Sequence, residues 1–402
     1  MLRPQSPKLL AISIVFLTMI LAVLLFHGSW PSPVKPVVDF EPVYLHGLRL
    51  SIWVGIFIFL TSAMLCYFII FSTDAHGHMS LDDRAGVQKH HEKAVPRIGG
   101  LAIFLALLIG LLAIALTRDA FFHTLSMNLK LLLVAVPVFL GGLLEDATKH
   151  VGSLQRLIFS MISASLFVII FHATIGSVGI AWIDQLLSYW PASLFFTVFA
   201  IAGVANSINI IDGFHGLASG LCIIILVATG SLAYMLHDIL LVRMSFSLVL
   251  ALMGFFIFNW PLGKLFLGDG GAYLIGFLLA TVMIIFQQTQ AISPWLPLNL
   301  LAYPVIETFY SIVRRLKRDK AITNPDAAHL HHLIFNYISS RYPNAASKNP
   351  LVAPCVWLPE IIFAALAVLN YQSTAALMGL FLIHVLLYIA CYKLLKRLTH
   401  LS

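Results

Sequence analysis

Residues 191–236 read PASLFFTVFAIAGVANSINIIDGFHGLASGLCIIILVATGSLAYML, two long apolar runs joined by a short polar segment. The runs at 191–208 and 217–236 each approach the roughly 20 residues that a helix needs to cross about 30 Å of hydrocarbon. The junction of the two runs, residues 206–216, carries two asparagines, an aspartate and a histidine. This stretch therefore predicts two membrane-spanning helices that meet at a polar end.

The same pattern runs through the whole chain. Of 402 residues, 60% are hydrophobic and only 10% are charged, a composition far from that of a soluble domain. Backbone groups in a bilayer must be paired internally, so we predict an all-α fold, a polytopic transmembrane helix bundle of about 11–12 helices. The expected spans are 9–26, 47–71, 98–117, 129–144, 157–175, 191–208, 217–236, 244–260, 272–288, 296–313, 351–370 and 374–393.

The distribution of basic residues predicts the orientation. With a cytoplasmic N-terminus, these spans place about 19 of the 24 Lys and Arg residues inside. Both termini are then cytoplasmic, and five polar motifs all lie at cytoplasmic helix ends. The net charge of +7 mainly reflects this bias. Binding of anionic lipid head groups or anionic substrates is a second explanation, and no nucleic-acid partner is expected.

The first motif covers residues 82–100 and ends in VPRIGG. Lys89, His91 and Arg97 offer cationic donors suited to phosphate, and Gly99 with Gly100 allows close approach at a helix start. A solvated basic loop is the alternative.

The second motif is the acidic pair Glu145 and Asp146, which directly follows an apolar run, with Lys149 three residues later. Adjacent carboxylates raise one another's proton affinity and the lysine offsets this, a setting for a base or for metal-bound water. The alternative is an interfacial cap that ends the helix.

In the third motif, a spacing of three places Asn206, Asn209 and Asp212 on one helical face at membrane depth. Such oxygen-bearing groups can coordinate a hard cation or bind uridine and sugar, or the asparagines can form interhelical hydrogen bonds. In the fourth, Asp269 stands among glycines in LGDGG, where it can hold a diphosphate through Mg²⁺ or sit in an ordinary turn.

The fifth motif is the histidine segment with His329, His331 and His332, in the longest cytoplasmic loop. Zinc binding lacks a complete ligand set, because no cysteine or carboxylate stands at the usual spacing. Contacts to a diphosphate or to uracil suit these side chains better, and a solvated loop is the remaining alternative.

In this order, QKHHEKAVPRIGG, LLEDATKH, NSINIIDGFHG, LGDGG and HLHH resemble the polyprenyl-phosphate N-acetylhexosamine-1-phosphate transferases of glycosyltransferase family 4. The resemblance covers roughly residues 70 to 335 and is nearest to the WecA/TagO/WbpL branch, which is related to the MraY enzymes. It departs from many members at two positions, Glu145 and His215, where aspartate is common.

The resemblance implies a role for each matching position. Asp269 and Asn206 would hold Mg²⁺, or Mn²⁺ in its place, and Asp146 with Glu145 would be catalytic. The substrates would contact Lys89, His91, Lys149, Asn209, Asp212, His329, His331 and His332. The partners implied are a UDP-N-acetyl sugar and a polyprenyl phosphate in the bilayer, and homodimers occur in the family.

The activity implied is transfer of a sugar-1-phosphate to undecaprenyl phosphate with release of UMP, at the cytoplasmic face of the inner membrane. This step would initiate lipid-linked O-antigen or capsule synthesis. The sugar and the choice between direct transfer and an aspartyl intermediate stay open. A flippase for lipid-linked sugars is the alternative, but the polar residues cluster at one face and no internal repeat is visible.

Three regions are expected. Residues 1–46 form an extra N-terminal helix and an external loop, because the run 9–26 lacks the cleavage site of a signal peptide. Residues 47–345 form the catalytic transmembrane domain with its cytoplasmic loops, and residues 346–402 form the C-terminal transmembrane helices.

Overall fold

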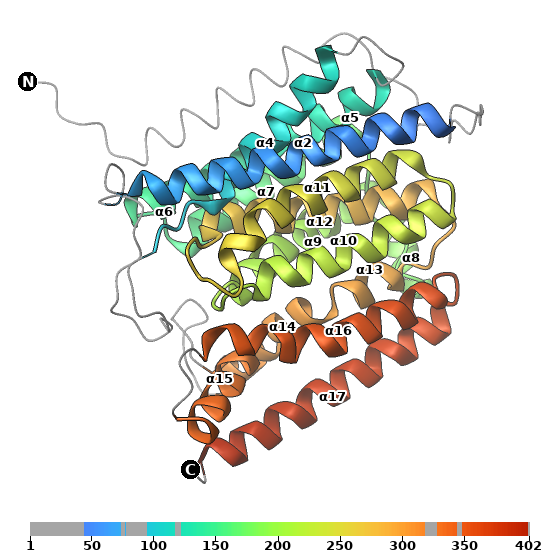
Figure 1. Ribbon diagram of the computed structural model, residues 1–402. Coiled ribbons are helices and arrows are strands. Elements are labelled where there is room, and N and C mark those ends of the chain that lie inside the picture. The colour runs from blue at the N-terminus through green and yellow to red at the C-terminus, as the bar shows by residue number, and fades with distance from the viewer. Residues whose placement is uncertain are drawn as a thin grey trace, which may run out of the picture.

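The computed structural model describes residues 44–73, 77, 95–116, 122–317, 328–343 and 348–400, and this part of the chain folds into helices without β-strands. The helices are α2 (Tyr44–Phe71), α4 (Gly99–Leu116), α5 (Phe122–Val134), α6 (Val136–Thr148), α7 (Ser153–Phe171), α8 (Ala181–Leu187), α9 (Trp190–Ile211), α10 (Leu217–Met235), α11 (Ile239–Asn259), α12 (Gly268–Thr289), α13 (Trp295–Leu300), α14 (Ala302–Leu316), α15 (Leu330–Arg341), a 3₁₀ turn (Asn349–Leu351), α16 (Val352–Leu369) and α17 (Thr374–His400). The predicted all-α polytopic bundle is confirmed (Figure 1).

Within the described residues, eight helices are long and apolar enough to cross a membrane, and the bent pair α5 and α6 makes a ninth. The expected span 9–26 lies outside the described residues. The expected domain boundary at 46 lies close to where the described residues begin and stays a prediction. The expected span 98–117 corresponds to α4, whose apolar stretch Gly99–Ala113 is shorter than the others. Length and hydropathy thus recognise eight or nine spans among the described residues, which do not include the expected span 9–26.

The expected span 296–313 is divided into two shorter helices, α13 and α14. Pro304 has no N–H group and cannot donate to the preceding turn, so the helix is interrupted where α14 begins. α14 also carries the buried Glu307, which a lipid-facing helix would not tolerate. Hydropathy alone locates this segment but does not reveal its break.

Successive long helices run in opposite directions, so their ends gather at two ends of the bundle (Figure 1). At one end, Asp238 before α11 accepts hydrogen bonds from Thr289 and Gln290 after α12. Trp295 at the start of α13 donates to the carbonyl oxygen of Val178 there (2.8 Å). The opposite end holds the ends of α6 and α9 and the starts of α12 and α15, where the polar motifs lie.

Helix α12 is the centre of the bundle. Every residue from Gly268 to Phe286 is buried, and the helix packs against α4, α6 and α9. Small residues permit this contact: a Cβ atom at Gly276 would lie 2.7 Å from the Cα of Ala205 on α9. Because α12 is enclosed on all sides, its first turn is held in a fixed position, and this turn carries Asp269.

Replacement of Gly268 by alanine is expected to destabilise the protein by about 3 kcal/mol or more. The φ of Gly268 is +74°, and a Cβ atom there would overlap the carbonyl oxygen of Arg97 and approach the Asp146 carboxylate to 2.6 Å. The measurement is the apparent Tm of the purified protein in detergent. Gly203→Ala in α9 is the matched control, because a Cβ atom there meets nothing within 4 Å. An equal Tm for both variants would contradict the packing described here.

Candidate active site

The segment before α4 lies beside the segment before α12. The N–H of Phe266 donates to the carbonyl oxygen of Pro96 (2.9 Å), and the N–H groups of Gly99 and Gly100 donate to Phe266 and Leu267 (3.0 and 2.9 Å). Two motifs that are about 170 residues apart in the sequence therefore meet through their backbones. This pairing brings Arg97 to the first turn of α12.

Asp146 of α6 caps the start of α12. Its Oδ1 atom accepts a hydrogen bond from the N–H of Asp269 (2.9 Å) and its Oδ2 atom accepts one from the N–H of Gly270 (2.8 Å). The first N–H groups of a helix have no partner within it, and here a carboxylate from a neighbouring helix supplies one. Asp146, which is 1% exposed, thereby fixes the backbone that carries Asp269.

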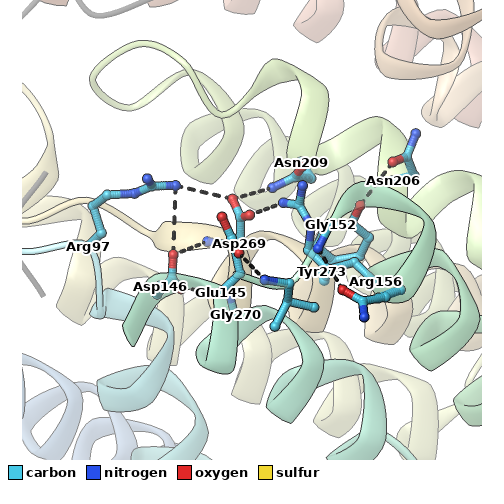
Figure 2. Close-up of polar contacts among 12 residues, drawn as sticks. Arg97, Glu145, Asp146, Gly152, Arg156, Asn206, Asn209, Asp269, Gly270 and Tyr273 are labelled. Carbon is cyan, nitrogen blue, oxygen red and sulfur yellow. Dashed lines mark hydrogen bonds and ion pairs between the residues drawn. The ribbon is translucent and has the colours of Figure 1, made fainter. Parts of the chain in front are cut away.

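Asp269 lies at the centre of a polar cluster (Figure 2). Its Oδ1 atom is 3.3 Å from Nη2 of Arg97 and accepts a hydrogen bond from Nδ2 of Asn209 (2.9 Å). Its Oδ2 atom forms an ion pair with Nη1 of Arg156. Arg97 also reaches Asp146, with 3.7 Å between Nη2 and Oδ1. Two guanidinium groups thus converge on one carboxylate at a helix N-terminus, an arrangement that favours anionic ligands.

Asn206 lies one turn before Asn209 on α9. Its Oδ1 atom accepts a hydrogen bond from the hydroxyl of Tyr273 (2.9 Å), one turn after Asp269 on α12. The guanidinium of Arg156 lies over the ring of the same tyrosine, 5.7 Å from its centre. The two asparagines therefore contact successive turns of α12, which runs antiparallel to α9, and Asn209 is the one that contacts Asp269 directly (Figure 2).

The donor atoms of this cluster fit a hard divalent cation. Asp269 contributes carboxylate oxygens and Asn206 an amide oxygen, the ligand type that Mg²⁺ prefers, whereas Asn209 turns its amide nitrogen toward Asp269. Among the described residues, no group of three or more His, Cys, Asp or Glu side chains could hold a metal ion. Mg²⁺ commonly uses one or two carboxylates and takes its remaining ligands from water and substrate phosphates, so a sparse oxygen site matches it. The predicted metal pair Asn206 and Asp269 stays a prediction.

Asp212 follows α9 directly and is close enough to Arg97 to sense its charge. Desolvation raises the pKa of Asp212 to about 7, and the Arg97 guanidinium opposes this rise. Near neutral pH, this group can therefore exist with or without its proton.

Glu145 supports the turn after α6. Its Oε2 atom accepts a hydrogen bond from the N–H of Val151 (2.7 Å), and its carbonyl oxygen accepts one from the N–H of Lys149 (2.8 Å). Lys149 adopts a left-handed conformation (φ 57°) with an exposed side chain. Both members of the acidic pair thus bind backbone N–H groups, and their predicted catalytic role is neither confirmed nor excluded by these contacts.

The histidine segment is held by α14 and by the end of the third motif. Nδ1 of His329 lies 2.9 Å from one oxygen of Glu307, and the N–H of Leu330 donates to the other (3.0 Å). Nδ1 of His331 lies 3.1 Å from the hydroxyl of Tyr303. All three predicted histidines are buried at this end of the bundle.

Phe214 joins the histidine segment to the third motif. Its ring packs edge-on against those of His331 and His332, with centroids 5.6 and 5.2 Å apart. Asp212 lies two residues before this phenylalanine. The structure therefore brings together the second, third, fourth and fifth motifs and the end of the first. Lys89 and His91 lie outside the described residues.

The sequence prediction assigned no role to Arg156, Tyr273 or Glu307. A carboxylate within the apolar run 296–313 was a usable signal for Glu307, since intramembrane acids usually have a partner and a function. Arg156 and Tyr273 gave no such signal, because an interfacial arginine and an apolar-run tyrosine are ordinary in membrane proteins. Only the packing of α7 and α12 shows that both touch the cluster.

A membrane helix bundle with carboxylates, arginines and histidines gathered at one end defines a polytopic membrane protein equipped to handle phosphate groups. Residues 128–287 match the model of glycosyl transferase family 4. This range includes the acidic pair, the third motif and LGDGG. This match, together with the curated relatives described next, supports the family of the polyprenyl-phosphate N-acetylhexosamine-1-phosphate transferases, which are phosphoglycosyltransferases.

Curated relatives agree with this family. An undecaprenyl-phosphate alpha-N-acetylglucosaminyl 1-phosphate transferase of Salmonella typhi is 28% identical over 293 residues, 71% of this chain and 76% of the relative. The protein with the same description from Escherichia coli K12 is 25% identical over 352 residues, 85% and 90% of the two chains. A probable undecaprenyl-phosphate N-acetylglucosaminyl 1-phosphate transferase of Bacillus subtilis strain 168 is 24% identical over 307 residues, 76% and 81%.

Proposed function

We propose that the chain transfers an N-acetylhexosamine-1-phosphate from a UDP-sugar to undecaprenyl phosphate and releases UMP. N-Acetylglucosamine is the first sugar to test, because the relatives named above act on it. The observation that carries the proposal is the cluster at the start of α12, where Asp269 contacts Arg97, Arg156 and Asn209.

The charge at this cluster suits a diphosphate. Arg97 and Arg156 carry fork-shaped donors that match phosphate oxygens, and the N-terminus of α12 adds a positive partial charge. The acceptor lipid lies in the bilayer with its phosphate at the surface, so a site at helix ends can reach both substrates. Phosphoryl transfer depends mainly on positioning and charge stabilisation, which such a cluster can supply.

In this reaction an oxygen of the acceptor phosphate attacks the β-phosphorus of the UDP-sugar. The bond from that phosphorus to the bridging oxygen breaks, and UMP leaves with the electron pair. Asp269 and the amide oxygen of Asn206 would hold Mg²⁺, which would supply positive charge against the negative charge that develops on the diphosphate. Asp146 keeps Asp269 in place through the backbone of α12, and Asp212 can hold or release a proton near neutral pH.

The histidine segment would bind the nucleotide or its diphosphate. Its rings are packed against Phe214 and fixed by Glu307 and Tyr303, so they present a preorganised surface next to the third motif. In direct transfer, the acidic pair would act on the acceptor phosphate. In a double displacement, one of its carboxylates would form a covalent intermediate, and burst-phase kinetics distinguish the two routes.

The same end of the bundle is proposed to face the cytoplasm of the inner membrane. Basic residues at this end include Lys264, Arg314, Arg315 and Lys393, whereas Arg243 lies near the start of α11 at the other end. This bias matches the excess of basic residues in cytoplasmic loops. UDP-sugars are present in the cytoplasm, so a site on this face would have access to them. The lipid-linked product would initiate a cell-surface polysaccharide such as O-antigen or capsule.

Removal of divalent metal is expected to abolish turnover reversibly. Purified protein with UDP-N-acetylglucosamine and undecaprenyl phosphate should release UMP with Mg²⁺, lose this activity in excess EDTA, and recover it with added Mg²⁺ or Mn²⁺. The UMP released is measured by chromatography. Full turnover in EDTA would contradict the proposed metal, and no turnover with any UDP-N-acetylhexosamine in Mg²⁺ would contradict the proposed function.

A further inference from the structure

We infer that Tyr392 of α17 is a positioning residue for the histidine segment, which it holds by one hydroxyl group. The inference rests on the proposed function only for the expected rise in KM, because the hydrogen bond from Tyr392 to Ala328 does not depend on that function. α17 lies beyond the residues that match the family model and carries none of the five motifs.

The hydroxyl of Tyr392 joins two places that are close in space and 14 residues apart in the chain. It donates a hydrogen bond to the carbonyl oxygen of Ala328 (3.0 Å), directly before His329, and accepts one from Nη1 of Arg314 (3.2 Å) near the end of α14. One buried hydroxyl therefore connects the point where the chain leaves α14 with the point where it enters the histidine segment.

The surroundings of Tyr392 restrict its movement. Its side chain is 3% exposed, and its ring packs against that of Tyr310 with centroids 4.6 Å apart. The guanidinium of Arg314 lies over both rings, 5.5 Å from the centre of Tyr392 and 5.9 Å from that of Tyr310. Nη2 of Arg314 also donates to Ser311 (3.3 Å), so the arginine is itself oriented.

α17 is anchored at its other end by contacts with α13. Nδ2 of Asn299 donates to the carbonyl oxygen of Leu377 (3.0 Å), and the hydroxyl groups of Ser293 and Thr374 lie 2.8 Å apart. Since Asn299 is 2% exposed, this hydrogen bond is shielded from water. The helix is thus a fixed support, and the Tyr392 hydroxyl transmits its position to Ala328.

Glu307 and Tyr392 hold the histidine segment from different sides. Glu307 binds His329 and the N–H of Leu330, whereas Tyr392 binds the carbonyl oxygen of Ala328. The other contacts act on His329 and the residues after it, so Tyr392 fixes the chain directly before the histidines. Tyr392 is not expected to touch the substrate, so its loss should weaken substrate binding without altering the chemical step.

The test compares Tyr392→Phe with Ser62→Ala. Ser62 of α2 is 0% exposed, and its hydroxyl donates to the carbonyl oxygen of Ala251 on α11 (2.7 Å). Both variants lose one hydroxyl that binds a backbone carbonyl oxygen, and only Tyr392→Phe loses a contact to the histidine segment. We expect the KM for UDP-N-acetylglucosamine to rise about 5- to 10-fold in Tyr392→Phe, with kcat within about twofold of wild type. Ser62→Ala should leave both constants unchanged.

Hydrogen exchange gives a readout that does not depend on activity. The amides of residues 330–333 should exchange about 5- to 10-fold faster in Tyr392→Phe than in wild type, and at the wild-type rate in Ser62→Ala. Equal exchange and equal KM in both variants would overturn the inference, as would a fall in kcat and Tm with no change in KM. An inactive wild-type protein would count against the proposed function alone, because the exchange experiment would still decide the role of Tyr392.

Discussion

Asp269→Asn is expected to lower kcat by about 10³-fold, although the protein should still fold. The substitution keeps the shape of the side chain and removes its negative charge, which a cation bound to a diphosphate requires. A 10³-fold fall in kcat corresponds to a loss of about 4 kcal/mol of transition-state stabilisation. Asp146 binds the backbone N–H groups of residues 269 and 270, so the start of α12 keeps its cap.

The same substitution leaves Arg97 and Arg156 without their shared counter-charge. Some loss of stability is therefore expected along with the loss of activity. Asp184→Asn is the matched control, since this carboxylate accepts hydrogen bonds from Ser177 and Val178 before α8, outside the active-site cluster. UMP release should be unchanged in the control. A fully active Asp269→Asn enzyme would remove the basis for placing the metal at α12.

Glu307→Gln is expected to reduce kcat/KM by about 10- to 100-fold. The buried carboxylate uses both oxygens, one with His329 and one with the N–H of Leu330. Glutamine fills the same space but turns one of these acceptors into a donor, which leaves a buried polar group unsatisfied at a cost of roughly 1–3 kcal/mol. The histidine segment would then lose its orientation against Phe214.

Glu360→Gln provides the comparison for that variant. Glu360 is also a buried carboxylate bound to a histidine, with 2.9 Å between Oε1 and Nε2 of His384, and this pair joins α16 to α17. Both variants should lower the apparent Tm, whereas only Glu307→Gln should lower kcat/KM. Equal kinetic losses in both would indicate that general destabilisation, and not the placement of the histidines, explains the effect.

Hydropathy predicts much of this fold because the bilayer requires each spanning segment to be long, apolar and helical. The expected runs from 157 to 288 appear as α7, α9, α10, α11 and α12 with boundaries shifted by a few residues. The break between α13 and α14 was not predicted, since it depends on Pro304 and a buried acid within an otherwise apolar run. Averaged hydropathy does not register either feature.

The motifs predict the location of the active-site cluster but not the connections within it. Asn209 and Asp269 were both expected in the site, and the structure brings them into contact. The cap that Asp146 forms on α12 was not expected, because a carboxylate on one helix gives no sign of which distant helix start it will meet. Glu307 contacts the histidine segment from 22 residues away in the sequence and Tyr392 from 64 residues away, so only the packing of α14 and α17 shows their roles.

The side chains around Asp269 are proposed to catalyse the transfer of a sugar-1-phosphate to a lipid phosphate. Mass spectrometry of the lipid formed by the purified protein, with UMP quantified in the same reaction, tests it most directly. We predict undecaprenyl diphosphate-linked N-acetylhexosamine in a one-to-one ratio with UMP from wild type, and neither product from Asp269→Asn. UMP formed without a modified lipid, or a modified lipid formed equally by both proteins, would contradict the account.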